Sequence, residues 1–381
     1  MNRYTSSQKT HYQVLDGLRG VAAIMVICYH VCEGFATSAI DQNFNHGYLA
    51  VDFFFALSGF VIGYAYDDRW SKGFTAREFI VRRLLRLHPM VVLAATTGVV
   101  AFALQGFTQW DGTSVSLWRV VTAFLLTIIM IPAWGNAAHE VRGNGEMFPL
   151  NGPSWSLFFE YIGNVIYMLL LRRMSTKTLA TFTAILGATY IAADVANISG
   201  CYYMGLGWTL AGNNFAGGMV RMLFSFSAGM LLSRTFTPCR MKRTFELCSL
   251  LIIVLLAVPY VGTTTNEPSI LNAIYESLCV IVIFPAIVWL GASGVISGKR
   301  KSAVCCFLGD ISYPLYIIHY PLMYLFYHWL WSGERSTEAI IAAIALLLPC
   351  CIALAYMAMR FYDTPLRTYI SKMLQKNRQN K

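Results

Sequence analysis

Three ionisable residues lie in the first long apolar run of this 381-residue sequence: Arg19, His30 and Glu33. An ionisable side chain inside a membrane-spanning helix costs roughly 2.5–3.5 kcal/mol, and such residues usually mark a function. Arg19 and His30 are eleven residues apart, which places them on one helical face about 16 Å from each other. Glu33 follows His30 by one turn, where its carboxylate could orient the imidazole. A histidine in this setting can serve as a general base or as a nucleophile.

A cluster of arginines opens the third apolar run, in the segment Arg82-Arg83-Leu84-Leu85-Arg86-Leu87-His88-Pro89. Arg83 and Arg86 are three residues apart and share a helical face. Together with Arg82 they form a group suited to phosphates, because guanidinium groups bind phosphate oxygens in pairs. The spacing alone also fits an ordinary basic anchor on the cytoplasmic side of a membrane.

Two carboxylates and a second histidine lie in later apolar runs: Asp52, Glu160 and His319. Asp52 needs a partner inside the membrane, and Arg19 is a candidate. Together with the residues above, these groups describe a polar path with cations at its mouth and a histidine with carboxylates further in. Such a path fits acid–base chemistry on a phosphate-bearing donor. It also fits a cation or proton pathway, so the residues alone leave the function open.

The elements that must position these residues are membrane-spanning helices. Hydrophobic residues make up 56% of the chain and charged residues 13%, whereas soluble proteins carry about 25% charged residues. Runs of about 18–22 apolar residues recur, each long enough to cross a hydrocarbon core of about 30 Å as a helix. The eleven candidates lie near residues 17–35, 47–66, 87–105, 116–134, 153–171, 178–196, 216–233, 245–262, 273–295, 309–331 and 338–359.

The charge of the connections tests this count, since cytoplasmic loops accumulate Lys and Arg. Basic and non-basic connections alternate along the chain if the run 116–134 is re-entrant, interfacial or packed within the bundle. The sequence therefore predicts an all-α polytopic membrane bundle with about ten crossings and both termini in the cytoplasm. It forms one domain over 1–381, with short cytoplasmic tails at 1–14 and 361–381. Eleven full crossings with one misplaced loop is the alternative.

Composition also speaks against some partners. The net charge of +10 could suggest nucleic acid, but its Lys and Arg residues gather in short loops, as membrane topology requires, so we expect no nucleic-acid partner. The ten cysteines lie mostly inside apolar runs and form no CxxC spacing, so we expect no metal site.

Several of these segments, in this order, resemble the acyltransferase 3 family of bacterial integral-membrane O-acyltransferases. They are Leu15–Gly20 leading to His30, similar to the family's Arg-x10-His element; Val51–Phe60; Arg82–Pro89, similar to its Arg-x-x-Arg element; Trp155–Leu157 with Glu160; and Ser312–Pro321. The sequence departs from the family pattern at Glu33, which is not a family feature, and at Leu87-His88-Pro89. The resemblance covers essentially the whole chain.

The resemblance implies an enzyme of the bacterial cytoplasmic (inner) membrane. It would transfer an acyl group, commonly acetyl from acyl-CoA, to a hydroxyl of a surface carbohydrate or lipid-linked glycan, with the lipid bilayer as its surroundings. It implies that His30 is the catalytic base, with Glu160 and Asp52 in supporting catalytic roles. It further implies that Arg19, Arg83 and Arg86 hold the phosphates of the donor.

The competing class is a transporter or flippase of a lipid-linked sugar or organic anion. Within the enzyme class, His30 could deprotonate the acceptor directly or first take the acyl group itself. The acceptor, the acyl group, the oligomeric state and the roles of Glu33 and His319 stay open at the level of the sequence.

Overall fold

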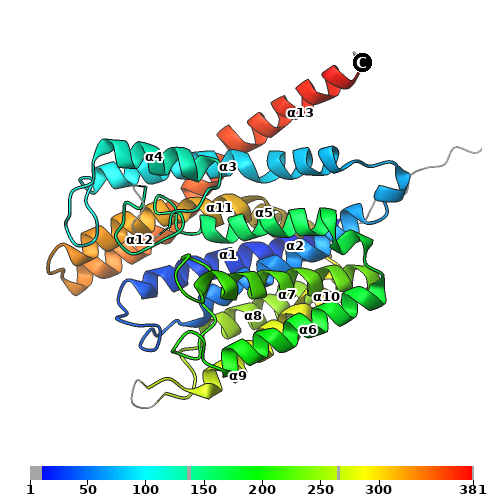
Figure 1. Ribbon diagram of the computed structural model, residues 1–381, viewed down its shortest axis with the longest axis horizontal. Helices are drawn as coiled ribbons and strands as arrows, with labels where there is room; N and C mark the ends of the chain where they lie inside the picture. Colours follow the sequence, from blue (N-terminus) through cyan, green and yellow to red (C-terminus); the bar gives the residue numbers. More distant parts are fainter. Residues whose placement is uncertain (1–10, 135–138, 264–266, 380–381) are drawn as a thin grey trace, which may run out of the picture.

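The computed structural model describes residues 11–134, 139–263 and 267–379, and these residues form a bundle of roughly parallel and antiparallel helices (Figure 1). The predicted tails 1–14 and 361–381 lie partly outside the described residues. The helices are α1 (Gln13–Glu33), α2 (Ala50–Tyr66), α3 (Ala76–Leu104), α4 (Leu117–Ile128), α5 (Ser154–Leu169), α6 (Thr176–Val195), α7 (Asn214–Thr235), α8 (Thr244–Ala257), α9 (Ile270–Leu278), α10 (Phe284–Ala292), α11 (Lys299–Trp331), α12 (Thr337–Met357) and α13 (Thr364–Gln379). Short 3-10 turns at His46–Leu49, Trp70–Lys72 and Leu171–Arg173 and π-helical turns at Cys279–Ile283 and Ala358–Asp363 join some of them.

Nine helical segments in the described part of the chain are long and apolar enough to cross a membrane, which confirms an all-α polytopic membrane protein. They are Gln13–Glu33, His46–Lys72, Ala76–Leu104, Ser154–Arg173, Thr176–Val195, Asn214–Thr235, Ile270–Ala292, Lys299–Trp331 and Thr337–Leu374.

The predicted tenth crossing corresponds to α8, which is only 14 residues long. At 1.5 Å per residue it extends about 21 Å, less than a full hydrocarbon core. Pro259 follows two residues after its end and disfavours helix at Val258, which explains why the helix is shorter than the apolar run. The sequence predicts about ten crossings, whereas nine segments of the described residues have the full length needed to span a membrane.

The run 116–134 forms α4, a helix of 12 residues that packs along α3. At about 18 Å it is too short to cross the membrane. Residues 139–153 then lead to the start of α5 (Figure 1). This arrangement confirms the prediction that 116–134 does not make a full crossing.

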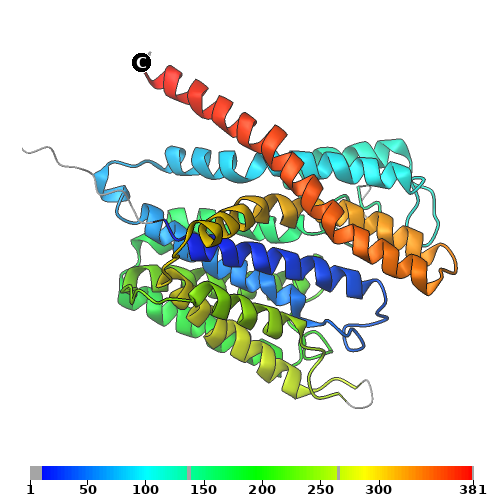
Figure 2. The ribbon, with the colours of Figure 1, turned by 180° about the vertical axis from the view of Figure 1, so that it is seen from behind.

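The direction of the helices agrees with the charge pattern. The connections at 67–75, 170–175, 236–243 and 293–298 lie at the same end of the bundle as the start of α1, and the other connections lie at the opposite end (Figures 1 and 2). We call the first the basic end, because its connections and the adjoining helix starts carry most of the Lys and Arg clusters. Helix α13 continues from α12 and projects away from the bundle toward the basic end (Figure 2).

Helices α1 and α2 hold central places in the packing. Helix α1 packs mainly on α11, and α2 packs mainly on α7. At the α2–α7 contact the backbones touch: a Cβ on Gly59 would lie 1.9 Å from the carbonyl oxygen of Phe226, and one on Gly229 would lie 1.9 Å from that of Ala56. Only glycine permits so close an approach, as is typical of packed membrane helices. Gly59 and Gly229 thus serve close helix packing.

Candidate active site

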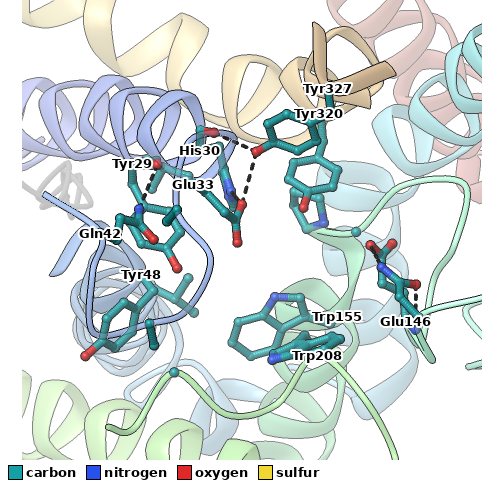
Figure 3. A pocket seen from close by; sticks show the side chains of 18 of the residues that line it. Tyr29, His30, Glu33, Gln42, Tyr48, Glu146, Trp155, Trp208, Tyr320 and Tyr327 are labelled. Atoms are coloured by element: carbon teal, nitrogen blue, oxygen red, sulfur yellow. Dashed lines mark hydrogen bonds and ion pairs between the residues drawn. The ribbon is translucent and has the colours of Figure 1, made fainter. Parts of the chain in front are cut away.

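His30 lies near the end of α1 that is opposite the basic end, and its ring is bound to Glu33. The Nδ1 atom of His30 is 2.6 Å from Oε2 of Glu33, the i,i+3 neighbour on the same helix. The hydroxyl of Tyr327 on α11 donates to the carbonyl oxygen of His30 at 2.6 Å and lies 3.1 Å from Oε2 of Glu33. Figure 3 shows these contacts at one side of a pocket. The contact between His30 and Glu33 that their spacing on one helix allows is thus present in the structure.

Aromatic rings enclose the imidazole of His30. The ring of His319 stacks on it at 5.5 Å between centroids, and those of Tyr320 and Tyr29 meet it edge-on at 4.7 and 4.9 Å. His319 is fully buried, and its Nδ1 donates to the carbonyl oxygen of Leu315 at 3.0 Å. These rings restrict the imidazole, and its Nδ1 atom is bound to Glu33. The Nε2 atom of His30 has no hydrogen-bond partner among the described residues.

A cavity of about 470 Å³, here called the histidine cavity, contains His30 and Glu33 in its lining. It lies toward the end of the bundle opposite the basic end, since the loop residues 36–39, Asn144 and Trp208 also line it. Aromatic residues are the largest group in its lining, and two carboxylates, two amides and Arg221 also line it. Figure 3 shows several of these rings around the pocket. The aromatic residues are Tyr29, Tyr48, Trp110, Trp155, Tyr203, Trp208, Tyr316, Tyr320, Tyr324, Tyr327 and Trp331.

The loop between α4 and α5 supplies one side of the histidine cavity. Glu146 is buried there, accepts a short hydrogen bond from the hydroxyl of Tyr324 and is 2.8 Å from Nδ2 of Asn144. Burial raises the pKa of this carboxyl, and the hydrogen bonds and the nearby Arg142 oppose that rise. The guanidinium of Arg142 lies 3.7 Å from the ring centroid of Tyr324 and donates to the carbonyl oxygen of Pro149. These contacts fix the loop against α11.

A second cavity, of about 400 Å³, lies toward the basic end and is lined by Arg19, Arg83, Arg86 and Glu160. We call it the arginine cavity. Arg19 donates from Nε to the hydroxyl of Ser312 at 2.7 Å and from Nη2 to the carbonyl oxygen of Gly309. Three predicted donor-binding arginines are thus brought together around one cavity.

Glu160 belongs to the arginine cavity and not to the surroundings of His30. Its Oε1 accepts from Nη2 of Arg83 at 2.5 Å and from the hydroxyl of Ser58 at 3.0 Å. It therefore fixes the direction of the Arg83 side chain, across the interface of α3 and α5. Arg86, by contrast, makes no hydrogen bond or ion pair with any described residue, so its guanidinium is available to a ligand.

Arg82 does not join the arginines at the cavity. It is exposed, and its guanidinium lies 5.5 Å from the ring centroid of Phe74. On a helix, Arg83 and Arg86 share a face, whereas Arg82 points about 100° away from Arg83. The predicted cluster of three is therefore reduced to Arg83 and Arg86, with Arg19 added from α1.

The two cavities share a thin wall. Val51 on α2 and Tyr316 on α11 line both of them. The hydroxyls of Tyr316 and Ser156 lie 2.6 Å apart, which bridges α11 and α5 at this point. The residues of the predicted polar path thus line two neighbouring cavities, with Val51 and Tyr316 between them.

Asp52 has a different partner from the predicted one. It pairs with Arg221 of α7, with Nη2 and Oδ2 2.6 Å apart, and both side chains are fully buried. Arg221 also donates to the carbonyl oxygens of Leu206 and Tyr48. The prediction that Arg19 pairs with Asp52 was wrong, because α2 turns this residue toward α7 and not toward the arginine cavity.

Reasoning from the sequence missed Arg221. It is an ionisable residue within the apolar run 216–233, so the same signal that selected His30 applied to it. Of the eleven aromatic residues that line the histidine cavity, Trp110, Tyr203 and Trp208 come from loops, where no periodic pattern distinguishes them. Within the described residues, no three His, Cys, Asp or Glu side chains come together as a possible metal site.

Comparison with known proteins identifies the class. The family model described as an acyltransferase domain matches residues 12–358, which is most of the chain. The protein is therefore a membrane-spanning O-acyltransferase, an enzyme that transfers acyl groups other than amino-acyl groups. It belongs to the acyltransferase 3 family, as its ordered motifs indicate. This membership decides for an enzyme over the transporter or flippase that the residues alone left open.

The relatives of the chain are distant. "Protein 2 in picA locus" of Rhizobium radiobacter is 33% identical over 170 residues, which cover 43% of this chain and 84% of that protein. "Acyltransferase MdmB" of Streptomyces mycarofaciens is 26% identical over 339 residues, 84% of this chain and 81% of that protein. "Putative O-acetyltransferase SAS0844" of Staphylococcus aureus strain MSSA476 is 24% identical over 392 residues, and this chain spans only 59% of its length. No solved structure gives a significant match.

Proposed function

We propose that this O-acyltransferase moves an acetyl group from acetyl-CoA to a hydroxyl of a surface carbohydrate or lipid-linked glycan. The observation that carries the proposal is the pair of cavities in series, one lined by arginines and the other by His30 and aromatic rings, with only a thin wall between them. A relative named as an O-acetyltransferase supports the choice of acetyl.

The arginine cavity would take the phosphate-bearing part of acyl-CoA. Arg86 lines this cavity and makes no hydrogen bond or ion pair with a described residue, and its guanidinium suits a phosphate group. Arg19 and Arg83 are held in place by Ser312 and by Glu160 and would add charge to the same site. Glu160 thus supports donor binding by fixing Arg83, and does not act on the acceptor.

The thioester end of the donor would pass Tyr316 and reach His30. There Nε2 of His30 takes the proton of the acceptor hydroxyl while the oxygen attacks the thioester carbonyl carbon. The carbon–sulfur bond then breaks, and the departing thiolate of CoA receives the proton from His30. The hydroxyl proton thus ends on the CoA thiol, the acyl group ends on the acceptor oxygen, and His30 returns to its starting state.

The histidine cavity suits a sugar-bearing acceptor. Tyr and Trp rings present large rigid apolar faces with a polar edge, which match a molecule that has both C–H faces and hydroxyls. Gln42, Asn144 and Glu146 lie between the rings and can bind hydroxyl groups. A cavity rich in aromatic residues with a few placed polar groups is typical of small-molecule sites.

We place the basic end of the bundle in the cytoplasm of a bacterial inner membrane. The basic connections and the start of α1 share that end, and cytoplasmic loops carry an excess of Lys and Arg. With this orientation the arginine cavity faces the compartment that contains acyl-CoA. The histidine cavity faces the opposite side, where a surface glycan is built or displayed.

The test uses the purified full-length protein with radiolabelled acetyl-CoA and a glycan fraction from bacterial membranes. We expect label in the glycan with the unchanged protein and none with His30→Ala, while His328→Ala, a histidine exposed on α11, serves as the matched control. Full turnover by a folded His30→Ala variant would remove His30 from the mechanism. Label on the protein itself in the absence of acceptor would replace direct transfer with an acyl-enzyme route.

A further inference from the structure

We infer that Glu33 is a positioning residue, which holds His30 in the tautomer that leaves Nε2 free to act as the base. This inference rests on the proposed role of His30 and deepens it. Glu33 does not need to touch the reacting atoms, because its effect passes through the imidazole ring. Tyr327 is the second member of the arrangement.

The geometry determines which nitrogen carries the proton. An ionised carboxylate only accepts hydrogen bonds, so at 2.6 Å from Oε2 of Glu33 the Nδ1 atom of His30 must be the donor. In a neutral imidazole the other nitrogen then keeps its lone pair. That atom is Nε2, which has no partner among the described residues and belongs to a side chain that lines the histidine cavity. Figure 3 shows Glu33 and His30 side by side at the cavity wall.

The carboxylate is itself held in place. Oε2 of Glu33 lies 3.1 Å from the hydroxyl of Tyr327, and that hydroxyl also donates to the carbonyl oxygen of His30 at 2.6 Å. The ring of Tyr327 is fixed by stacking on Trp331 at 5.0 Å between centroids. Because Tyr327 belongs to α11 and the other two residues to α1, the arrangement also depends on the packing of these two helices.

The ring of His30 has little freedom to turn. His319 stacks on it, and Tyr29 and Tyr320 meet it edge-on. The side chain of Glu33 remains 39% exposed to the cavity, whereas that of His30 is 16% exposed. The carboxylate therefore keeps contact with the cavity while the imidazole is confined.

This arrangement would act during the proton transfer. When Nε2 takes the proton of the acceptor hydroxyl, the imidazole becomes a cation next to a carboxylate. The carboxylate stabilises that cation and is not itself protonated, so Glu33 is unchanged at the end of the cycle. The same logic applies to the aspartate of serine protease triads, whose replacement by asparagine changes the tautomer and lowers the rate by about 10⁴-fold.

Glu33→Gln tests the inference, because it keeps the shape of the side chain and removes the charge. We expect kcat for acetyl transfer to fall by about 10²-fold or more. The KM for acetyl-CoA should stay within about twofold, since the loss concerns a step after binding. Glu33→Asp keeps a carboxylate and should recover part of the loss. Glu246→Gln, at an exposed residue on α8 that lines neither cavity, is the matched control with unchanged kcat.

A second variant covers the case in which Glu33→Gln fails to fold. Tyr327→Phe removes one hydroxyl, keeps the ring, and should lower kcat by about 10-fold. The inference would be overturned if the variant that folds had the same kcat as the unchanged protein while His30→Ala was inactive. The proposed function would still stand in that case. Full activity of His30→Ala would instead contradict the proposed function itself.

Discussion

The buried ion pair between Asp52 and Arg221 allows a prediction that separates a structural role from a catalytic one. Both side chains are fully buried, and three distances of 2.6 to 3.2 Å join them. Asp52→Asn keeps the size of the side chain but leaves the guanidinium without a counter-charge. Breaking a buried pair in this way costs about 3–5 kcal/mol. That is a large part of the roughly 5–15 kcal/mol by which folded proteins are stable.

The assay is thermal unfolding of the protein in detergent, together with kcat per folded molecule. We expect Asp52→Asn to lower the unfolding temperature clearly and to keep most of the activity of the molecules that remain folded. The double variant Asp52→Leu with Arg221→Met removes both charges and should recover much of the stability. Lys301→Ala breaks the exposed pair with Glu246 and should cost less than about 1 kcal/mol.

The opposite pattern would refute this reasoning. If Asp52→Asn unfolded at the same temperature as the unchanged protein and lost its activity, Asp52 would be a catalytic group, as the family resemblance implies. If the double variant were no more stable than Asp52→Asn, the cost would come from lost packing and not from the unpaired charge.

Three more predictions follow from the cavities and the helix contacts. Arg86→Ala should weaken acetyl-CoA binding by about 1.5–3 kcal/mol, while the exposed Arg82→Ala should not; equal effects in a direct binding measurement would restore the view of both as membrane anchors. Tyr316→Ala should widen the passage between the cavities and raise the kcat/KM for butyryl-CoA relative to acetyl-CoA by about 10-fold; an unchanged ratio would mean that the acyl group does not pass this wall. Gly59→Ala should destabilise the protein by at least about 1–3 kcal/mol, because its Cβ would lie 1.9 Å from a carbonyl oxygen of α7, and normal thermal stability would contradict the close helix contact.

Features that depend on one helix could be predicted from the sequence. The contact of His30 with Glu33 follows from their spacing on α1, and the shared face of Arg83 and Arg86 follows from theirs on α3. The place of the basic connections at one end of the bundle could also be predicted. Cytoplasmic loops accumulate Lys and Arg, and successive crossings place the connections at the two ends in turn.

Features that depend on contacts between helices could not be predicted in this way. Asp52 and Arg221 are 169 residues apart, and no periodicity within α2 or α7 shows which helix faces the other. The same holds for Glu160, which the sequence grouped with His30 and the structure places beside Arg83. Tyr316 lies between the two cavities, and its position depends on contacts with Ser156 of α5 and Phe54 of α2, which are distant in the sequence.

The most direct test of the central claim is acetyl transfer measured in sealed bacterial membrane vesicles of known orientation, with radiolabelled acetyl-CoA added only to the outside. If the arginine cavity binds the donor from the cytoplasm and His30 transfers the acyl group across the wall at Tyr316, inside-out vesicles should place label on glycans and right-side-out vesicles should not. Equal labelling by both kinds of intact vesicle would contradict a one-sided donor site at the arginines.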